Sequence, residues 1–271
     1  MSACPLVQAV GMRPGTMAAA VGGGGKTSIL EALARGCHAA GWRPAVLTTT
    51  TKIFAPGEDV GLLLGEAGAL GEALAGKAAA AAGHLVLARA RLGEAPVPGA
   101  PDRRRMKLEG FPPGEVSRFR TEEGVLLVEA DGARGLPVKA PGPGEPAVPA
   151  GAEIVLGVVG LDSIGKPLDA ANACRPGRLA ELAGQPAGSP IGPGTIARLA
   201  LHPEGIFRGS PGGARRILIL NKADGLKTVE ESENFAYSIM NVAGAPKGPV
   251  DAVLCTSCLL PAPRVLFRLP G

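Results

Sequence analysis

Short apolar segments alternate with segments of helical periodicity along most of this 271-residue chain, and this alternation limits the possible folds more than any other feature. We predict strands over Met17–Val21, Pro44–Phe54, His84–Arg91, Gly124–Gly132, Glu153–Gly160, Arg215–Asp224 and Asp251–Ser257. Several of them are continuously apolar, as in parallel strands covered on both faces. The sequence therefore predicts an α/β fold, with a mostly parallel sheet and helices on both of its faces.

The segments between these strands predict the helices. From Thr27, apolar residues recur at helical spacing, and Gly41 ends the pattern. Further helices are expected over Ala67–Ala82, Gly177–Ala183, Thr195–Leu201 and Val229–Val242. Two Pro- and Gly-rich zones, Gly93–Gly114 and Ala140–Ala150, are interpreted as loop insertions in a single domain spanning residues 1–271, because strand patterns resume directly after each.

The glycine run VGGGGKTS follows the first predicted strand and precedes the first long helix. Ala20 stands where a full P-loop, G-x-x-x-x-G-K-[ST], has its first glycine, so the match is to the shorter G-G-x-G-K-[ST]. Small residues let backbone N–H groups approach phosphate oxygens at a helix N-terminus. The residues expected to bind nucleotide phosphates are Gly22, Gly23, Gly24, Gly25, Lys26, Thr27 and Ser28. The pattern favours a P-loop NTPase-like fold, although a mobile glycine turn is the alternative.

Polar residues at the ends of two other strands predict the chemistry. Glu129 and Asp131 are two residues apart, so on a strand they share one face, as carboxylates that organise Mg²⁺ and a nucleophile do. We expect Lys26, Glu129 and Asp131 to be catalytic. Thr50 comes from the run TTTTK, Thr48–Lys52, and we expect it to join Thr27 and Asp131 around Mg²⁺.

The tetrapeptide N-K-A-D, Asn221–Asp224, follows another apolar strand and resembles the guanine-reading motif of GTPases. Asp224 would accept hydrogen bonds from the purine, Lys222 would lie along the ring and Asn221 would brace the phosphate loop. Arg134 stands where the D-x-x-G motif of GTPases needs a glycine, so GTP or ATP with Mg²⁺ remain the candidate cofactors.

The charge, hydropathy and cysteine content of the chain argue against several classes of protein. The net charge of +4 is mild, and we interpret the basic run Asp102–Lys107 as a solvated loop rather than a nucleic-acid surface. No apolar stretch is long enough to span a membrane, and no secretory signal is present, so we expect a cytoplasmic protein without a membrane partner. Five irregularly spaced cysteines fit reduced thiols, and the isolated Cys255–Cys258 pair is a weak metal or redox signal.

These blocks together resemble the YqeC family of accessory proteins of selenium-dependent molybdenum hydroxylases. The residues that carry the resemblance are VGGGGKTS, LTTTTKIF, VEADGARGLPVKAP, EPAVP, VVGLDSIGKPL, RPGRLAEL and LNKAD, in this order from about Leu6 to Asp224. The resemblance implies a nucleotide-binding maturation factor whose partner is the molybdenum cofactor or a molybdenum hydroxylase. By position, it implies a site made of Lys26, Thr27, Glu129, Asp131, Arg134, Lys139, Glu145, Asp162 and Arg175.

Two positions depart from the family pattern. Gly144 and Cys174 stand where histidine is usual, so a step that depends on those histidines would be altered here. We expect Arg134, Lys139 and Arg175 to converge beside the phosphate loop as a second anion site. Three functions stay open: a nucleotide-hydrolysing maturation factor, a small-molecule kinase or phosphotransferase, and a non-catalytic, nucleotide-gated cofactor-binding protein.

Overall fold

The central sheet matches the predicted class. The computed structural model describes residues 4–77, 83–225, 234, 236–239, 250–257 and 264–270. In this part of the chain, nine strands form one sheet in the order β14-β13-β12-β10-β1-β8-β2-β5-β4, parallel throughout except for β14 at one edge. Their bounds are β1 Met17–Gly22, β2 Ala45–Thr49, β4 Gly61–Leu64, β5 Leu85–Ala88, β8 Val125–Glu129, β10 Ile154–Gly160, β12 Arg215–Asn221, β13 Ala252–Ser257 and β14 Arg264–Pro270.

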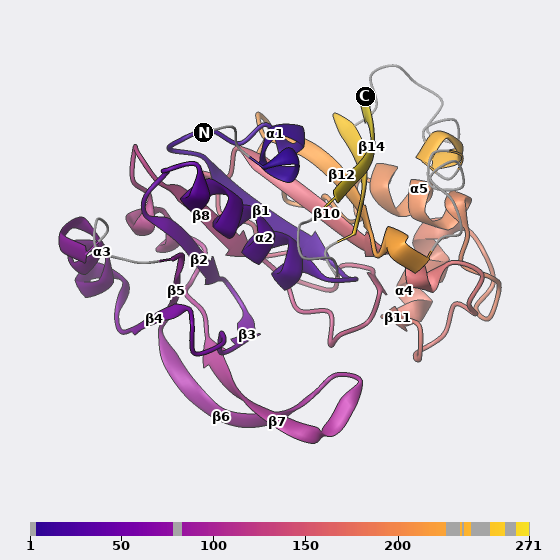
Figure 1. Ribbon diagram of the computed structural model, residues 1–271. Coiled ribbons are helices and arrows are strands. Elements are labelled where there is room, and N and C mark those ends of the chain that lie inside the picture. The colour runs from indigo at the N-terminus through magenta and orange to yellow at the C-terminus, as the bar shows by residue number, and fades with distance from the viewer. Residues whose placement is uncertain are drawn as a thin grey trace.

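Helices cover both faces of this sheet (Figure 1). One face packs against α1 Pro5–Val10 and α2 Lys26–Ala39, and the other against α3 Ala67–Lys77, α4 Pro176–Ala183 and α5 Pro193–Leu201. The strand β1 divides its residues between the two cores in alternation, since Ala18 and Ala20 pack on the α2 side and Ala19 and Val21 on the other. The α/β prediction, with helices on both faces, is confirmed.

The order of the strands places a crevice at the end of β1. The chain moves from β1 outward to β2, β4 and β5, returns to β8 beside β1, and then passes across β1 to β10 on its other side. In open α/β sheets, ligands bind where the strand order reverses in this way, at the carboxyl ends of the strands. The residues that follow β1, β8 and β10 therefore lie at the expected binding edge.

The segment 93–114 is not the irregular loop that its composition suggested. It contains most of a hairpin, β6 Ala90–Val97 and β7 Ala100–Glu109, which pairs with β3 Lys52–Phe54 in a separate three-stranded sheet. Figure 1 shows this hairpin curving away from the central sheet. Because much of it is exposed, prolines are tolerated in its strands, and Pro98–Gly99 form its turn. Its glycines and prolines hid a strand pattern.

Other boundaries differ from the predictions. The predicted strand Pro44–Phe54 is divided into β2 and β3, and His84–Arg91 into β5 and the start of β6, because the chain leaves the central sheet at both points. The second loop zone, Ala140–Ala150, is irregular as predicted. Parts of the predicted helices Ala67–Ala82 and Val229–Val242 lie outside the described residues. The remaining short elements are β9 Val138–Lys139, β11 Ala173–Cys174, η1 Val116–Phe119, η2 Leu161–Ser163 and η3 Ala223–Gly225.

Candidate functional site: the Gly loop and two adjoining cavities

The segment Gly22–Thr27, here called the Gly loop, joins the end of β1 to the start of α2 in a conformation that needs glycine. Gly22, Gly24 and Gly25 have φ values of 92°, 73° and 111°. A Cβ on Gly24 would lie 2.0 Å from the backbone nitrogen of Gly160, and one on Gly22 would lie 2.4 Å from the carbonyl oxygen of Val158. No side chain caps α2 at Gly25, so the first N–H groups of the helix face outward without a helical partner.

Three neighbouring segments hold the Gly loop in place. The N–H of Gly23 donates to the carbonyl of Val158 (2.9 Å), and that of Gly24 donates to the carbonyl of Leu136 (3.0 Å). The amide Nδ2 of Asn221 donates to the carbonyl oxygen of Gly24 over 2.8 Å. This last contact joins the N-K-A-D segment to the Gly loop. The loop is therefore fixed by β10 and the end of β12 on one side and by the irregular segment between β8 and β9 on the other.

Lys26 is buried and ion-paired. Its Nζ lies 3.0 Å from Oδ1 of Asp131 and donates to the carbonyl of Gly22 over 2.6 Å. Burial alone lowers the pKa of Lys26, but the charges of Asp131 and Glu129 outweigh burial, and the pKa is raised. Lys26 thus carries its charge at neutral pH, as a phosphate ligand must.

Glu129 and Asp131 both face the Gly loop, as their spacing predicted. Thr27 donates from Oγ1 to Oε2 of Glu129 over 2.6 Å, and the N–H of Gly22 donates to Oδ2 of Asp131 over 3.0 Å. Burial raises the pKa of Glu129 despite the opposing effects of Lys26 and Thr27. A carboxylate with a raised pKa beside a phosphate site has the properties of a general base.

The three expected magnesium ligands are all engaged in contacts within the protein. Thr27 and Asp131 lie at the Gly loop, whereas Thr50 lies beside Glu129, donating its N–H to the Glu129 carbonyl over 3.1 Å and its hydroxyl to the carbonyl of Ala147 over 2.9 Å. Among the residues that the structure describes, no three side chains of His, Cys, Asp or Glu gather as a metal site. Thr27 and Asp131 are oxygen ligands of the kind that Mg²⁺ prefers, and they fit the ion once it replaces their contacts with Glu129 and Lys26.

A chain of alternating charges continues from Asp131 away from the Gly loop. Lys139 is buried, and its Nζ lies 3.2 Å from Oδ2 of Asp131 and 2.7 Å from Oε2 of Glu145. The same Glu145 oxygen lies 2.7 Å from Nη1 of Arg175. Burial raises the pKa of Glu145, but its contacts with Arg175 and Lys139 outweigh burial and lower it. Lys139 is therefore a partner of two carboxylates, and Arg175 is the end of the chain that reaches solvent.

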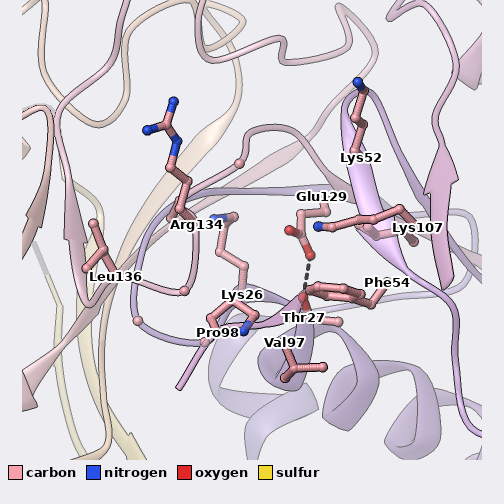
Figure 2. Close-up of a pocket in the computed structure, with 16 residues that line it drawn as sticks. Lys26, Thr27, Lys52, Phe54, Val97, Pro98, Lys107, Glu129, Arg134 and Leu136 are labelled. Atoms are coloured by element: carbon pink, nitrogen blue, oxygen red, sulfur yellow. Dashed lines mark hydrogen bonds between the residues drawn. The ribbon is translucent and has the colours of Figure 1, made fainter. Parts of the chain in front are cut away.

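Two cavities open beside the Gly loop. The first is lined by Gly24, Gly25, Lys26, Thr27, Lys52, Ile53, Phe54, Val97, Pro98, Lys107, Glu129, Gly132, Ala133, Arg134, Gly135 and Leu136 (Figure 2). The second is lined by Thr50, Thr51, Lys52, Arg89, Lys107, Glu109, Gly110, Phe111, Pro112, Gly132, Arg134, Glu145, Cys174 and Arg175. The two share Lys52, Lys107, Gly132 and Arg134, so they adjoin. Lys139, which was expected to line an anion site with Arg134 and Arg175, lines neither cavity.

Sequence reasoning missed several residues of this site, among them Lys52, Phe54, Arg89 and Lys107. Lys107 belongs to the basic run interpreted as a solvated loop, yet it lies on β7 and lines both cavities. Its Nζ lies 3.8 Å from the centre of the Phe54 ring, in a cation–π contact. Figure 2 shows Lys107 extending toward Glu129. The sequence offered one signal for this contact, the TTTTKIF segment, which contains Phe54. This segment includes β3, and β3 pairs with β7 so that Phe54 lies opposite Lys107.

The N-K-A-D residues are engaged in contacts outside the linings of the two cavities. Lys222 pairs with Asp162, with Nζ 2.7 Å from Oδ2. The hydroxyl of Ser257 donates to Oδ1 of Asp224 over 2.6 Å, and Thr256 donates to Oδ1 of Asn221 over 3.2 Å. None of the tetrapeptide lines either cavity.

Strained backbone marks several of these positions. Among the described residues, Arg134, Arg175 and Lys222 are the only non-glycine residues with positive φ, at 54°, 61° and 63°. Such a conformation costs about 1–3 kcal/mol and persists where the surroundings impose it, often at functional sites. All three are residues that the sequence singled out.

The two departures from the family pattern lie close to the same region. Cys174 lines the second cavity, and Gly144 precedes Glu145 with φ of 70° and open space around the position of its absent Cβ. Cys255 is buried in β13, whereas Cys258 lies outside the described residues. No helix in the described ranges is both long and apolar enough to cross a membrane.

The match to a known protein family covers most of the residues of this site. The family model described as YqeC protein matches residues 18–177, which include the Gly loop, both carboxylates and Arg175. The chain is 30% identical over 210 residues to the YqeC protein of Escherichia coli (strain K12), and the match covers 76% of each chain. No solved structure matches the chain significantly.

Proposed function

The chain belongs to the YqeC family, and from this premise we propose that it binds a Mg²⁺–nucleoside triphosphate at the Gly loop and hydrolyses it. One observation carries the proposal. The Lys26 ammonium and the Thr27 hydroxyl at the uncapped start of α2 lie within 3.0 Å of carboxylate oxygens of Asp131 and Glu129 at the end of the neighbouring strand. Phosphoryl transfer needs these groups together: a cation and N–H groups for the phosphates, oxygen ligands for the metal and a base.

The contacts of these residues suggest how each group would act. Lys26 would exchange Asp131 for phosphate oxygens, and Thr27 and Asp131 would then hold the ion. Bound there, Mg²⁺ would supply positive charge to the phosphate oxygens in the transition state. Glu129, released from Thr27, would accept a proton from the attacking water, for which its raised pKa suits it.

The biological role is proposed from the family resemblance. We infer an accessory protein in the maturation of selenium-dependent molybdenum hydroxylases, with the molybdenum cofactor or the hydroxylase as partner. A second candidate function, a small-molecule phosphotransferase, is favoured by a specific observation, because a second cavity adjoins the one that contains Glu129. A carrier that binds nucleotide without turnover is the third.

Calorimetry and phosphate release together test the proposal. The protein should bind Mg²⁺–GTP or Mg²⁺–ATP, and Lys26→Ala should weaken binding about tenfold or more, since charge-assisted contacts contribute about 1.5–3 kcal/mol. Lys166→Ala, which removes an exposed lysine, is the matched control and should bind as the wild type does. Equal binding by Lys26→Ala and wild type would end the proposal. Binding without phosphate release would favour the carrier, and release only with an added acceptor would favour the phosphotransferase.

A further inference from the structure

The wall of the second cavity concentrates positive charge. Among the described residues that line it, the cations are Lys52, Arg89, Lys107, Arg134 and Arg175, and the carboxylates are Glu109 and Glu145. Glu145 is already neutralised, because Lys139 and Arg175 both pair with it. Arg89 pairs with Glu66 outside the cavity lining, with Nε 3.3 Å from Oε1, but Lys52, Lys107 and Arg134 leave the cavity positive. The charges come from β3, β7 and the segments that follow β5, β8 and β11.

Several of these cations have no internal partner. In the part of the chain that the structure describes, neither Lys52 nor Arg134 makes an ion pair or a side-chain hydrogen bond. Lys107 contacts the Phe54 ring rather than a carboxylate. The pKa of Lys107 is lowered, first by burial and also by the charge of Lys52, while Glu129 opposes this. Like charges gathered in one hollow repel one another, and a bound anion relieves that repulsion.

The cavity is also large enough for a molecule. Its volume is about 580 Å³, within the range of about 300–1,000 Å³ that is usual for small-molecule sites. The first cavity, at about 210 Å³, suits a phosphate group rather than a whole ligand. The shared residues Lys52, Lys107 and Arg134 border both, so a molecule in the second cavity would approach the terminal phosphate of a nucleotide in the first.

We propose that the second cavity binds a small molecule with two or more anionic groups, phosphate or carboxylate, separately from the nucleotide. The proposal rests on the proposed function for the identity of the first cavity, but the binding itself does not require nucleotide. Arg89 and Arg175 border only the second cavity, so they distinguish its ligand from a nucleotide at the Gly loop.

Calorimetry at fixed ionic strength, without nucleotide or Mg²⁺, tests this with two probes. 3-Phosphoglycerate carries a phosphate and a carboxylate, and tricarballylate carries three carboxylates. Either probe should bind the wild type, and the variant Arg89→Gln/Arg175→Gln should bind it about tenfold or more weakly. The control Arg91→Gln/Arg103→Gln removes the same charge from exposed hairpin positions outside the cavity and should bind within about twofold of the wild type. Preference for one probe tells a phosphate site from a carboxylate site.

A labelling experiment covers the case in which the double variant unfolds. Phenylglyoxal modifies accessible arginines, and peptide mapping should show that the bound probe protects Arg89 and Arg175 while Arg103 stays reactive. If neither probe binds the wild type at 10 mM or below, or if Arg103 is protected equally, the second site does not exist. Absence of probe binding to the wild type, with intact nucleotide binding, overturns this inference alone. Intact probe binding with no nucleotide binding overturns the proposed function alone.

Discussion

Two sets of charged side chains surround the Gly loop, and they differ in whether their charges are balanced. The first set is the alternating chain Lys26–Asp131–Lys139–Glu145–Arg175, whose first three members are 5%, 2% and 1% exposed. The second set is the cavity wall with Lys52, Lys107 and Arg134, none of which forms an ion pair with a carboxylate among the described residues. Paired buried charges hold a site in shape and are costly to break, whereas unpaired charges at a cavity are available to a ligand.

The largest effect should follow from breaking the paired set. Lys139→Met leaves Asp131 and Glu145 each without one partner inside the protein. Removing one member of a buried ion pair costs about 3–5 kcal/mol, so the free energy of unfolding in urea should fall by that amount. Lys52→Met is the matched control, because the same substitution at the cavity wall removes no partner. A loss below about 1 kcal/mol for Lys139→Met would show that the chain of charges does not hold the site together.

Features that depend on a local sequence pattern could be predicted from the sequence, whereas features that depend on long-range contacts could not. The Gly loop, the helix after it and the pair Glu129 and Asp131 lie in short segments whose strand and helix periodicities are visible directly. The contacts of Lys139 could not be predicted in this way, because its partner Glu145 lies on an irregular loop. Nothing in the residue spacing distinguishes a buried lysine from one that faces a ligand. Only the fold resolves such choices.

The hairpin illustrates the same limit. Prolines and glycines are typical of loops, and β6 and β7 contain several of them. They form strands because the hairpin pairs with β3 outside the central sheet, where few of their residues are buried. Lys107 and Phe54 then meet across that pairing, so their place in the site depends on a register that the local pattern does not contain.

The next largest effect concerns Glu129, which lies between the two sets. Glu129→Gln should keep nucleotide affinity and lower the turnover rate about a hundredfold, as expected for a general base. The base acts only when deprotonated, so wild-type turnover should fall as the pH drops through a pKa above the usual glutamate range. Single-turnover phosphate release across pH measures both. Unchanged turnover in Glu129→Gln would reassign this residue to holding Thr27 in place.

A smaller effect is expected at the N-K-A-D loop, where pairing is partial. Asp224 accepts from Ser257 through Oδ1, and on the proposed function its other oxygen, Oδ2, would accept from a purine. Asp224→Asn should weaken GTP about tenfold and improve xanthosine triphosphate, because the substitution turns an acceptor into a donor. Competition against a fluorescent GTP analogue measures both, with ATP as the internal control. If ATP competes as well as GTP in the wild type, the loop does not read guanine.

The smallest effect on stability should come from a substitution in the unpaired set. Whether stability rises or falls tests most directly that the two sets differ in charge balance. Lys52→Gln removes a charge that lowers the pKa of Lys107. A lysine whose pKa is lowered by folding makes the folded state less stable at any pH at which the lysine is charged in the unfolded chain. Lys52→Gln removes part of this repulsion. The free energy of unfolding at neutral pH should therefore stay unchanged or rise by up to about 0.5 kcal/mol. With 3-phosphoglycerate present the order should invert, because the wild type gains more from binding the anion. Urea denaturation with and without this probe measures both, and a loss above about 1 kcal/mol without it would place Lys52 among the paired charges.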